Sequence, residues 1–174
     1  VLEAGRAHEG ETSEAATDAA AAAASAAAAP SDTVRRIMAY AEKNATADTG
    51  FSAGGVTMSF VLEQRPDLFC VYLHCCSSWP ADPTPVAKTR LPVYIAVGEQ
   101  DEYFGLEPSR EIYEELQELY RQQGLSGEEI DRLLVLDVKN DAYFSERGVE
   151  KQHEGGVLFG EDPEIMGWLF EKRK

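Results

Sequence analysis

The sequence is poor in basic residues and cysteine, and it has no long apolar run. Sixteen Lys and Arg residues stand against 31 Asp and Glu residues, which gives a formal net charge of -15 at pH 7. Because so acidic a surface repels phosphate backbones and anionic membrane surfaces, we expect no nucleic-acid partner. Charged or turn residues interrupt the apolar stretches well before the roughly 20 residues that cross a bilayer, so we expect no membrane-spanning role.

The three cysteines, Cys70, Cys75 and Cys76, lie in one short segment. Their odd number and clustering do not resemble a disulfide framework, so we expect reduced thiols. His74 beside Cys75 and Cys76 suggests metal ligands, but adjacent side chains seldom converge on one tetrahedral ion, and no second ligand pair exists. We therefore predict structural cysteines and no metal site.

The length suits one domain, since 174 residues are too few for two well-buried cores. Residues 1–30 have low complexity, with an alanine-rich run at 19–29 that only Ser25 interrupts. Such a run buries little surface, so we place the folded domain at 31–174. The segment 1–30 lacks the basic start and strongly apolar centre of a secretory signal, and we favour a cytoplasmic location over a secreted one.

Strands and helices alternate along the predicted domain. Short apolar runs predict a parallel strand covered on both faces at 68–73, a second buried strand at 91–97 and a further strand at 133–138. Apolar stripes and helix-boundary residues predict helices at 34–44, 53–63 and 108–123 and after Pro163. This alternation predicts an α/β fold with a mostly parallel sheet flanked by helices.

Residues 50–54, Gly-Phe-Ser-Ala-Gly, fit the G-x-S-x-G pattern of a nucleophile elbow. In such a turn the serine hydroxyl is exposed on a strained backbone, and the glycines leave room where strand and helix approach too closely for a Cβ atom. Ser52 is therefore the predicted nucleophile. The backbone amide of Ala53, at the start of the next helix, is the predicted oxyanion donor.

A candidate acid follows the predicted strand 91–97. Asp101 lies in the loop at the carboxyl edge of the sheet, where α/β proteins form their ligand sites, and is our predicted acid. The neighbours Glu99 and Glu102 are alternatives, and Asp137 and Asp141 after the next strand are more distant ones.

His153 completes the chain order Ser, Asp, His that α/β-hydrolases use, and it is the predicted general base. Of the other two histidines, His8 belongs to the low-complexity segment and His74 abuts a strand. Aromatic residues beside the predicted nucleophile and acid are candidates for substrate binding, namely Phe51, Tyr103 and Phe104.

Four segments resemble one branch of the α/β-hydrolases, the polyhydroxybutyrate depolymerases and feruloyl esterases. They are TGFSAGG at 49–55, RPDLF at 65–69, VGEQD at 97–101, and DPEI with WLF at 162–170. The resemblance covers about 50–174. It implies a serine esterase that cleaves small-molecule carboxylic esters without a cofactor, with Ser52 as nucleophile, Asp101 as acid and His153 as base.

The sequence departs from this family before the elbow. A hydrophobic strand leads into the elbow in the family, whereas residues 43–49 are polar and cannot form a buried central strand. The family's earlier strands and the loop that donates a second oxyanion amide have no counterpart in residues 1–30. We therefore expect that the sequence carries the catalytic half of a longer protein.

Two alternative functions stay open beside ester hydrolysis through an acyl-enzyme intermediate. A serine peptidase of the prolyl-oligopeptidase type shares the fold, the triad order and a glycine-rich elbow. A catalytically inactive hydrolase domain used for binding would account for the polar segment before the elbow.

Overall fold

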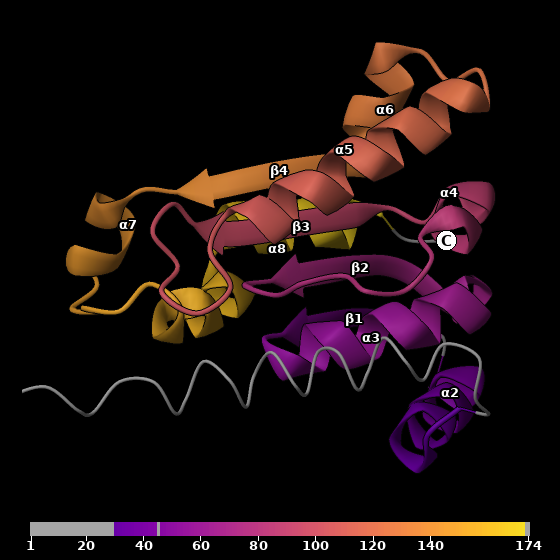
Figure 1. Cartoon of the computed structure of the whole chain (residues 1–174), viewed down its shortest axis with the longest axis horizontal. Coiled ribbons are helices and arrows are strands. Elements are labelled where there is room, and N and C mark those ends of the chain that lie inside the picture. Colours follow the sequence, from indigo (N-terminus) through magenta and orange to yellow (C-terminus); the bar gives the residue numbers. More distant parts are fainter. Residues whose placement is uncertain (1–29, 45, 173–174) are drawn as a thin grey trace, which may run out of the picture.

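The computed structural model describes residues 30–44 and 46–172, so the predicted low-complexity segment, apart from Pro30, lies outside the described residues. Within them, four parallel strands form one sheet in the order β1-β2-β3-β4 (Figure 1). The strands are β1 (Thr46–Phe51), β2 (Phe69–Cys75), β3 (Val93–Gly98) and β4 (Leu134–Lys139). Their carboxyl ends all point to the same edge of the sheet.

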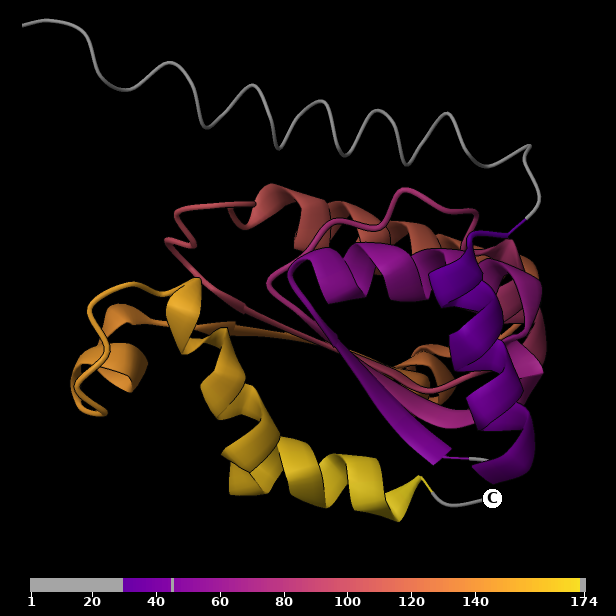
Figure 2. The same cartoon turned by 90° about the horizontal axis from the view of Figure 1, so that it is seen from below.

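Helices cover both faces of this sheet (Figure 2). One face carries α2 (Asp32–Asn44), α3 (Ala53–Gln64), α4 (Thr84–Thr89), α5 (Glu107–Gln122) and α6 (Gly127–Leu133). The other face carries α7 (Asp141–Ser145), the 3-10 helix η2 (Glu154–Glu161) and α8 (Pro163–Glu171). A short 3-10 turn, η1 (Pro66–Leu68), leads into β2.

The alternation of side chains along the strands creates two cores. In β3, Val93 and Ile95 belong to the core under α2 to α6, whereas Tyr94 and Ala96 belong to the core under η2 and α8. Successive side chains of a strand point to opposite faces, and a parallel sheet with both faces covered needs apolar residues at every position. This requirement explains the continuous apolar run of β3, which is buried throughout.

The predicted α/β fold with a parallel sheet is confirmed, and the predicted strands and long helices occur within one or two residues of their expected bounds. The polar segment before the elbow forms a strand that the sequence analysis did not predict. It forms β1, at the edge of the described sheet, with Ala47 and Thr49 exposed. Its pairing with β2 supplies backbone hydrogen bonds along one side, so the strand needs no apolar run. The sequence prediction also missed the short helices α4, α6, α7 and η2.

Of the helices in 30–44 and 46–172, none combines the length and the apolar character needed to cross a lipid bilayer.

Candidate active site

Ser52 occupies a sharp turn between β1 and α3. Its φ of 53° lies in the left-handed region, which a residue with a side chain adopts only when its surroundings hold it there. The Ser52 amide donates to the Cys75 carbonyl (3.1 Å). The Ser52 carbonyl accepts from the Gly55 amide (2.9 Å) and the Ser77 hydroxyl (2.6 Å). Backbone strain at Ser52 is therefore balanced by bonds to both sides of the turn.

Two glycines permit the close packing of this elbow. A Cβ at Gly50 would overlap the Tyr72 hydroxyl and lie 2.7 Å from Gly55 Cα, and a Cβ at Gly55 would lie 2.6 Å from Ser77 Oγ. Gly54, by contrast, has nothing within 4 Å of its would-be Cβ. The motif suggests that Gly50 and Gly54 leave room for the close contact of strand and helix. This holds for Gly50, but on the helix side the glycine that leaves room is Gly55.

The structure brings the side chains of Ser52, Asp101 and His153 into one hydrogen-bonded chain. His153 Nε2 lies 3.1 Å from Ser52 Oγ, and His153 Nδ1 lies 2.9 Å from Asp101 Oδ2. Ser52 directly follows β1, Asp101 lies in the loop after β3, and His153 directly precedes η2. Because the strands are parallel, these segments meet at the same edge of the sheet.

The Asp101 carboxylate is held from several sides. Its Oδ1 accepts hydrogen bonds from the amides of Tyr103 (3.0 Å), Phe104 (2.8 Å) and Gly105 (3.3 Å), while Oδ2 faces His153. Burial by itself raises the pKa of Asp101, but the hydrogen bonds from His153 and from the amides of Phe104 and Tyr103 outweigh it, so the pKa lies below its ordinary value. Asp101 therefore stays ionised beside the imidazole.

The alternative acids have other partners. Glu99 accepts the Asp141 amide (2.9 Å), and Asp137 accepts the Tyr94 hydroxyl (2.8 Å) and pairs with Lys139. Glu102 binds backbone amides of the loop that carries His153. Among these candidates, Asp101 is the carboxylate at the imidazole.

The three aromatic residues predicted to bind substrate surround the His153 ring. The ring centroids of Phe51, Tyr103 and Phe104 lie 5.2, 5.0 and 5.9 Å from that of the imidazole. Tyr103 is 59% exposed, whereas the His153 side chain is only 16% exposed. The aromatic rings thus shield the imidazole from solvent, and the ring of Tyr103 is itself exposed to solvent.

A buried polar network under the elbow was not predicted from the sequence. His74 is fully buried, with Nδ1 3.2 Å from the Tyr72 hydroxyl and Nε2 3.2 Å from the Ser77 carbonyl. Burial disfavours the imidazolium and lowers the pKa of His74 to about 4, although the bond to Ser77 acts in the opposite direction. A histidine inside an apolar strand was the one signal available in the sequence.

Cys76 lies beside the acid and the base. Its Sγ, a carboxylate oxygen of Asp101 and a ring nitrogen of His153 lie within 4.8 Å of one another, a spacing that suits a metal ion. Burial raises the pKa of the Cys76 thiol, and the Asp101 charge raises it further. The Asp101 carboxylate and the His153 imidazole are bonded to each other at 2.9 Å.

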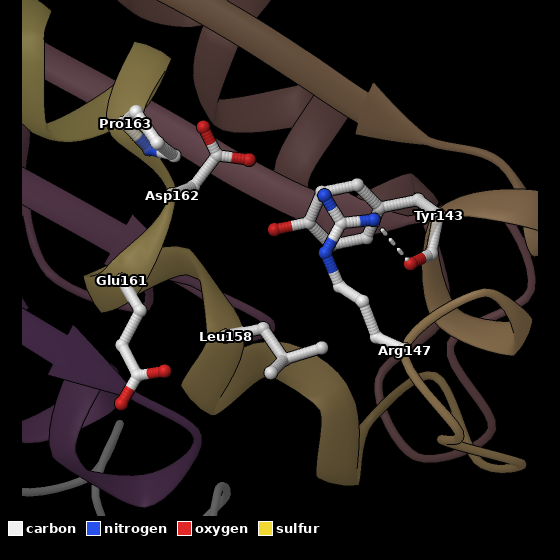
Figure 3. A pocket seen from close by; sticks show the side chains of 6 residues that line it. All are labelled: Tyr143, Arg147, Leu158, Glu161, Asp162 and Pro163. Atoms are coloured by element: carbon white, nitrogen blue, oxygen red, sulfur yellow. Dashed lines mark hydrogen bonds between the residues drawn. The ribbon is translucent and has the colours of Figure 1, made fainter.

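A pocket of about 250 Å³ lies apart from these residues, between α7, η2 and the start of α8. Figure 3 shows the Arg147 guanidinium over the Tyr143 ring, with Asp162 on the facing side. The guanidinium carbon is 4.0 Å from the ring centroid, and Arg147 also donates to the Tyr143 carbonyl (2.8 Å). Arg147 thus has both its ring contact and its hydrogen bond within the protein. No predicted site residue lines the pocket.

Comparison with known proteins gives a fold. No family model matches the sequence, and no curated protein matches it. The structure is similar to the crystal structure of a thermostable esterase, with a TM-score of 0.57 and 21% sequence identity over 74% of this chain. The fold is that of an α/β-hydrolase. The chain spans 31% of the esterase's length, so the hydrolase fold is matched over only part of that protein.

Proposed function

We propose that the protein is a serine hydrolase that cleaves carboxylic esters of small molecules. The observation that carries this proposal is the chain of hydrogen bonds from Asp101 through His153 to Ser52, with Ser52 held at a positive φ. A serine hydroxyl is a weak nucleophile until an adjacent base, oriented by a third group, takes its proton. The three side chains satisfy this requirement at distances suited to proton transfer.

In the proposed reaction, His153 Nε2 takes the proton of Ser52 as Oγ attacks the ester carbonyl. The tetrahedral adduct then collapses: the bond between the carbonyl carbon and the alkoxide oxygen breaks, and His153 donates that proton to the alkoxide. The alcohol departs, and the acyl group stays on Ser52 Oγ as the acyl-enzyme. A water molecule, activated by His153, attacks the acyl-enzyme and releases the acid. Asp101 holds Nδ1–H in place and stabilises the imidazolium that forms in each half-reaction. The steps require no cofactor.

The amide of Ala53 is the proposed oxyanion donor. Ala53 is the first residue of α3, directly after Ser52, and the first amides of a helix have no acceptor within the helix. An amide so placed faces the oxygen on which negative charge develops. We assign substrate contacts to Phe51, Tyr103 and Phe104, because their rings flank the base and Tyr103 is open to solvent.

Replacing Ser52 with alanine tests the proposal. We expect Ser52→Ala to lower kcat for p-nitrophenyl acetate at least about 10⁴-fold and to abolish labelling by a fluorophosphonate probe. Ser145→Ala is the matched control, since Ser145 is an exposed serine at the end of α7, and it should leave both readouts unchanged.

Two other results would replace the proposal. Faster cleavage of peptide amides than of aryl esters would favour the prolyl-oligopeptidase-like peptidase. A folded protein that shows neither turnover nor labelling would favour a hydrolase domain used for binding.

A further inference from the structure

Two loops that carry the proposed acid and base are joined by hydrogen bonds in both directions. From the loop after β3, the Glu102 carboxylate accepts the amides of Gln152 (2.8 Å) and His153 (2.9 Å). From the loop before η2, Gln152 Oε1 accepts the amide of Gln100 (2.8 Å). The loops are about fifty residues apart in the sequence, so these contacts exist only in the folded chain.

Both carboxylate oxygens of Glu102 accept a backbone hydrogen bond. Oε1 binds the Gln152 amide and Oε2 binds the His153 amide, so one carboxylate holds two successive peptide groups, the second being that of the proposed base itself. Hydrogen bonds to an ionised acceptor are stronger than neutral ones. Burial alone raises the pKa of Glu102, but the two amides lower it below its ordinary value, in keeping with an ionised carboxylate.

Gln152 fills the space behind this contact. It is only 2% exposed, and its side chain lies so close to Gly98, the last residue of β3, that a Cβ there would be 2.8 Å from Gln152 Cβ. The loop before η2 therefore packs against the end of β3 through Gln152, and Glu102 accepts hydrogen bonds from the backbone of that loop. A shift of this loop would move the His153 imidazole relative to both Asp101 and Ser52.

We propose that Glu102, supported by Gln152, is a positioning residue that aligns His153 between Asp101 and Ser52. This inference rests on the proposed hydrolase function. Glu102 contacts the backbone of the base and not its ring, so it acts through His153 and takes no proton in the reaction. Its removal changes the geometry of proton transfer and leaves the substrate-binding surface in place.

The same loop offers a matched control. Glu99 is a second glutamate of the loop, and its Oε1 accepts one amide, that of Asp141, at 2.9 Å. Glu99→Ala and Glu102→Ala thus remove the same charge and the same type of bond from one loop. Of these two glutamates, only Glu102 is bonded to the segment of His153.

We expect Glu102→Ala to lower kcat for p-nitrophenyl acetate about tenfold with KM within twofold, because small displacements of a catalytic group cost rate more than binding. Glu99→Ala should leave kcat within twofold. Glu102→Gln keeps one carbonyl oxygen as an acceptor and should recover part of the lost rate. Hydrogen exchange of the Gln152 and His153 amides should be faster in Glu102→Ala than in the unaltered protein.

Equal losses of kcat in Glu99→Ala and Glu102→Ala, or a change confined to KM or thermal stability, would overturn the positioning role. So would unchanged turnover in Glu102→Ala. Failure of the hydrolase function itself gives a different result, since the unaltered protein would then show neither turnover nor fluorophosphonate labelling of Ser52.

Discussion

The elbow of Ser52 and the loops of Asp101 and His153 meet at one edge of the sheet, but different forces hold them. The elbow depends on steric fit, since Gly50 and Gly55 allow contacts that a Cβ would prevent. The acid and base loops depend on hydrogen bonds to carboxylates, with Asp101 and Glu102 together accepting five amides. The nucleophile should therefore be sensitive to added volume and the acid–base pair to lost acceptors, and the two regions should respond to pH in different ranges.

The largest effect should come from Gly55→Ala. The new methyl group meets Ser77 Cβ and Oγ at 2.6 Å and the Gly50 carbonyl at 3.1 Å, so we expect a loss of about 3 kcal/mol in the free energy of unfolding and no fluorophosphonate labelling. Gly54→Ala, one residue away in the open, should be neutral or stabilising by up to about 1 kcal/mol, because alanine favours helix. Urea titration of both variants measures the difference. Equal changes in the free energy of unfolding for Gly55→Ala and Gly54→Ala would show that the close contact at Gly55 does not stabilise the elbow.

The two regions should also lose stability in different pH ranges. The pKa of His74 lies near 4 in the folded protein, against 6.5 ordinarily, so the unfolded chain binds the extra proton first as pH falls. Between pH 7 and pH 5 the free energy of unfolding should drop by about 2 kcal/mol from this group. Urea titrations of His74→Asn over this range should lack that part of the pH dependence.

The carboxylates of the acid and base loops respond at lower pH. The pKa values of Asp101 and Glu102 lie below their ordinary values of 3.8 and 4.5, so their stabilisation is complete above that range and is lost as pH falls through the folded-state values. A His74→Asn variant that loses as much stability as the unaltered protein between pH 7 and pH 5 would contradict this separation.

The smallest effect should come from a single hydroxyl. Ser77→Ala removes the bond to the Ser52 carbonyl and should cost about 1 kcal/mol of stability and slow fluorophosphonate labelling about tenfold. Ser59 is also buried and donates to a carbonyl, that of Val56, so Ser59→Ala should cost similar stability. Its labelling rate should stay within twofold. Thermal melts and labelling time courses on both variants separate a loss of stability from a loss of position.

The buried strands were predictable because they must be apolar on both faces. β2 and β3 follow this rule, and their runs stand out in the sequence. β1 does not, since an edge strand with exposed Ala47 and Thr49 carries no such pattern. The short helices α4, α6 and α7 span too few turns for an apolar stripe to be recognised.

The site divides in the same way. The motif at Ser52 and the order of Asp101 and His153 along the chain were readable, and the structure places these three side chains together. The part played by Glu102 was not readable, because a glutamate that binds amides fifty residues away looks like any other in so acidic a chain. Nor did the motif show that the close contact is at Gly55.

The sequence by itself determined the α/β class, the acidic surface charge and the three residue types of the candidate site, because apolar periodicity, net charge and local motifs are properties of neighbouring residues. Only the tertiary structure decided which carboxylate meets His153, which glycine the elbow requires and how the two loops are joined. These features depend on distances between atoms far apart in the chain, and such distances are set when the parallel strands bring their carboxyl ends to one edge.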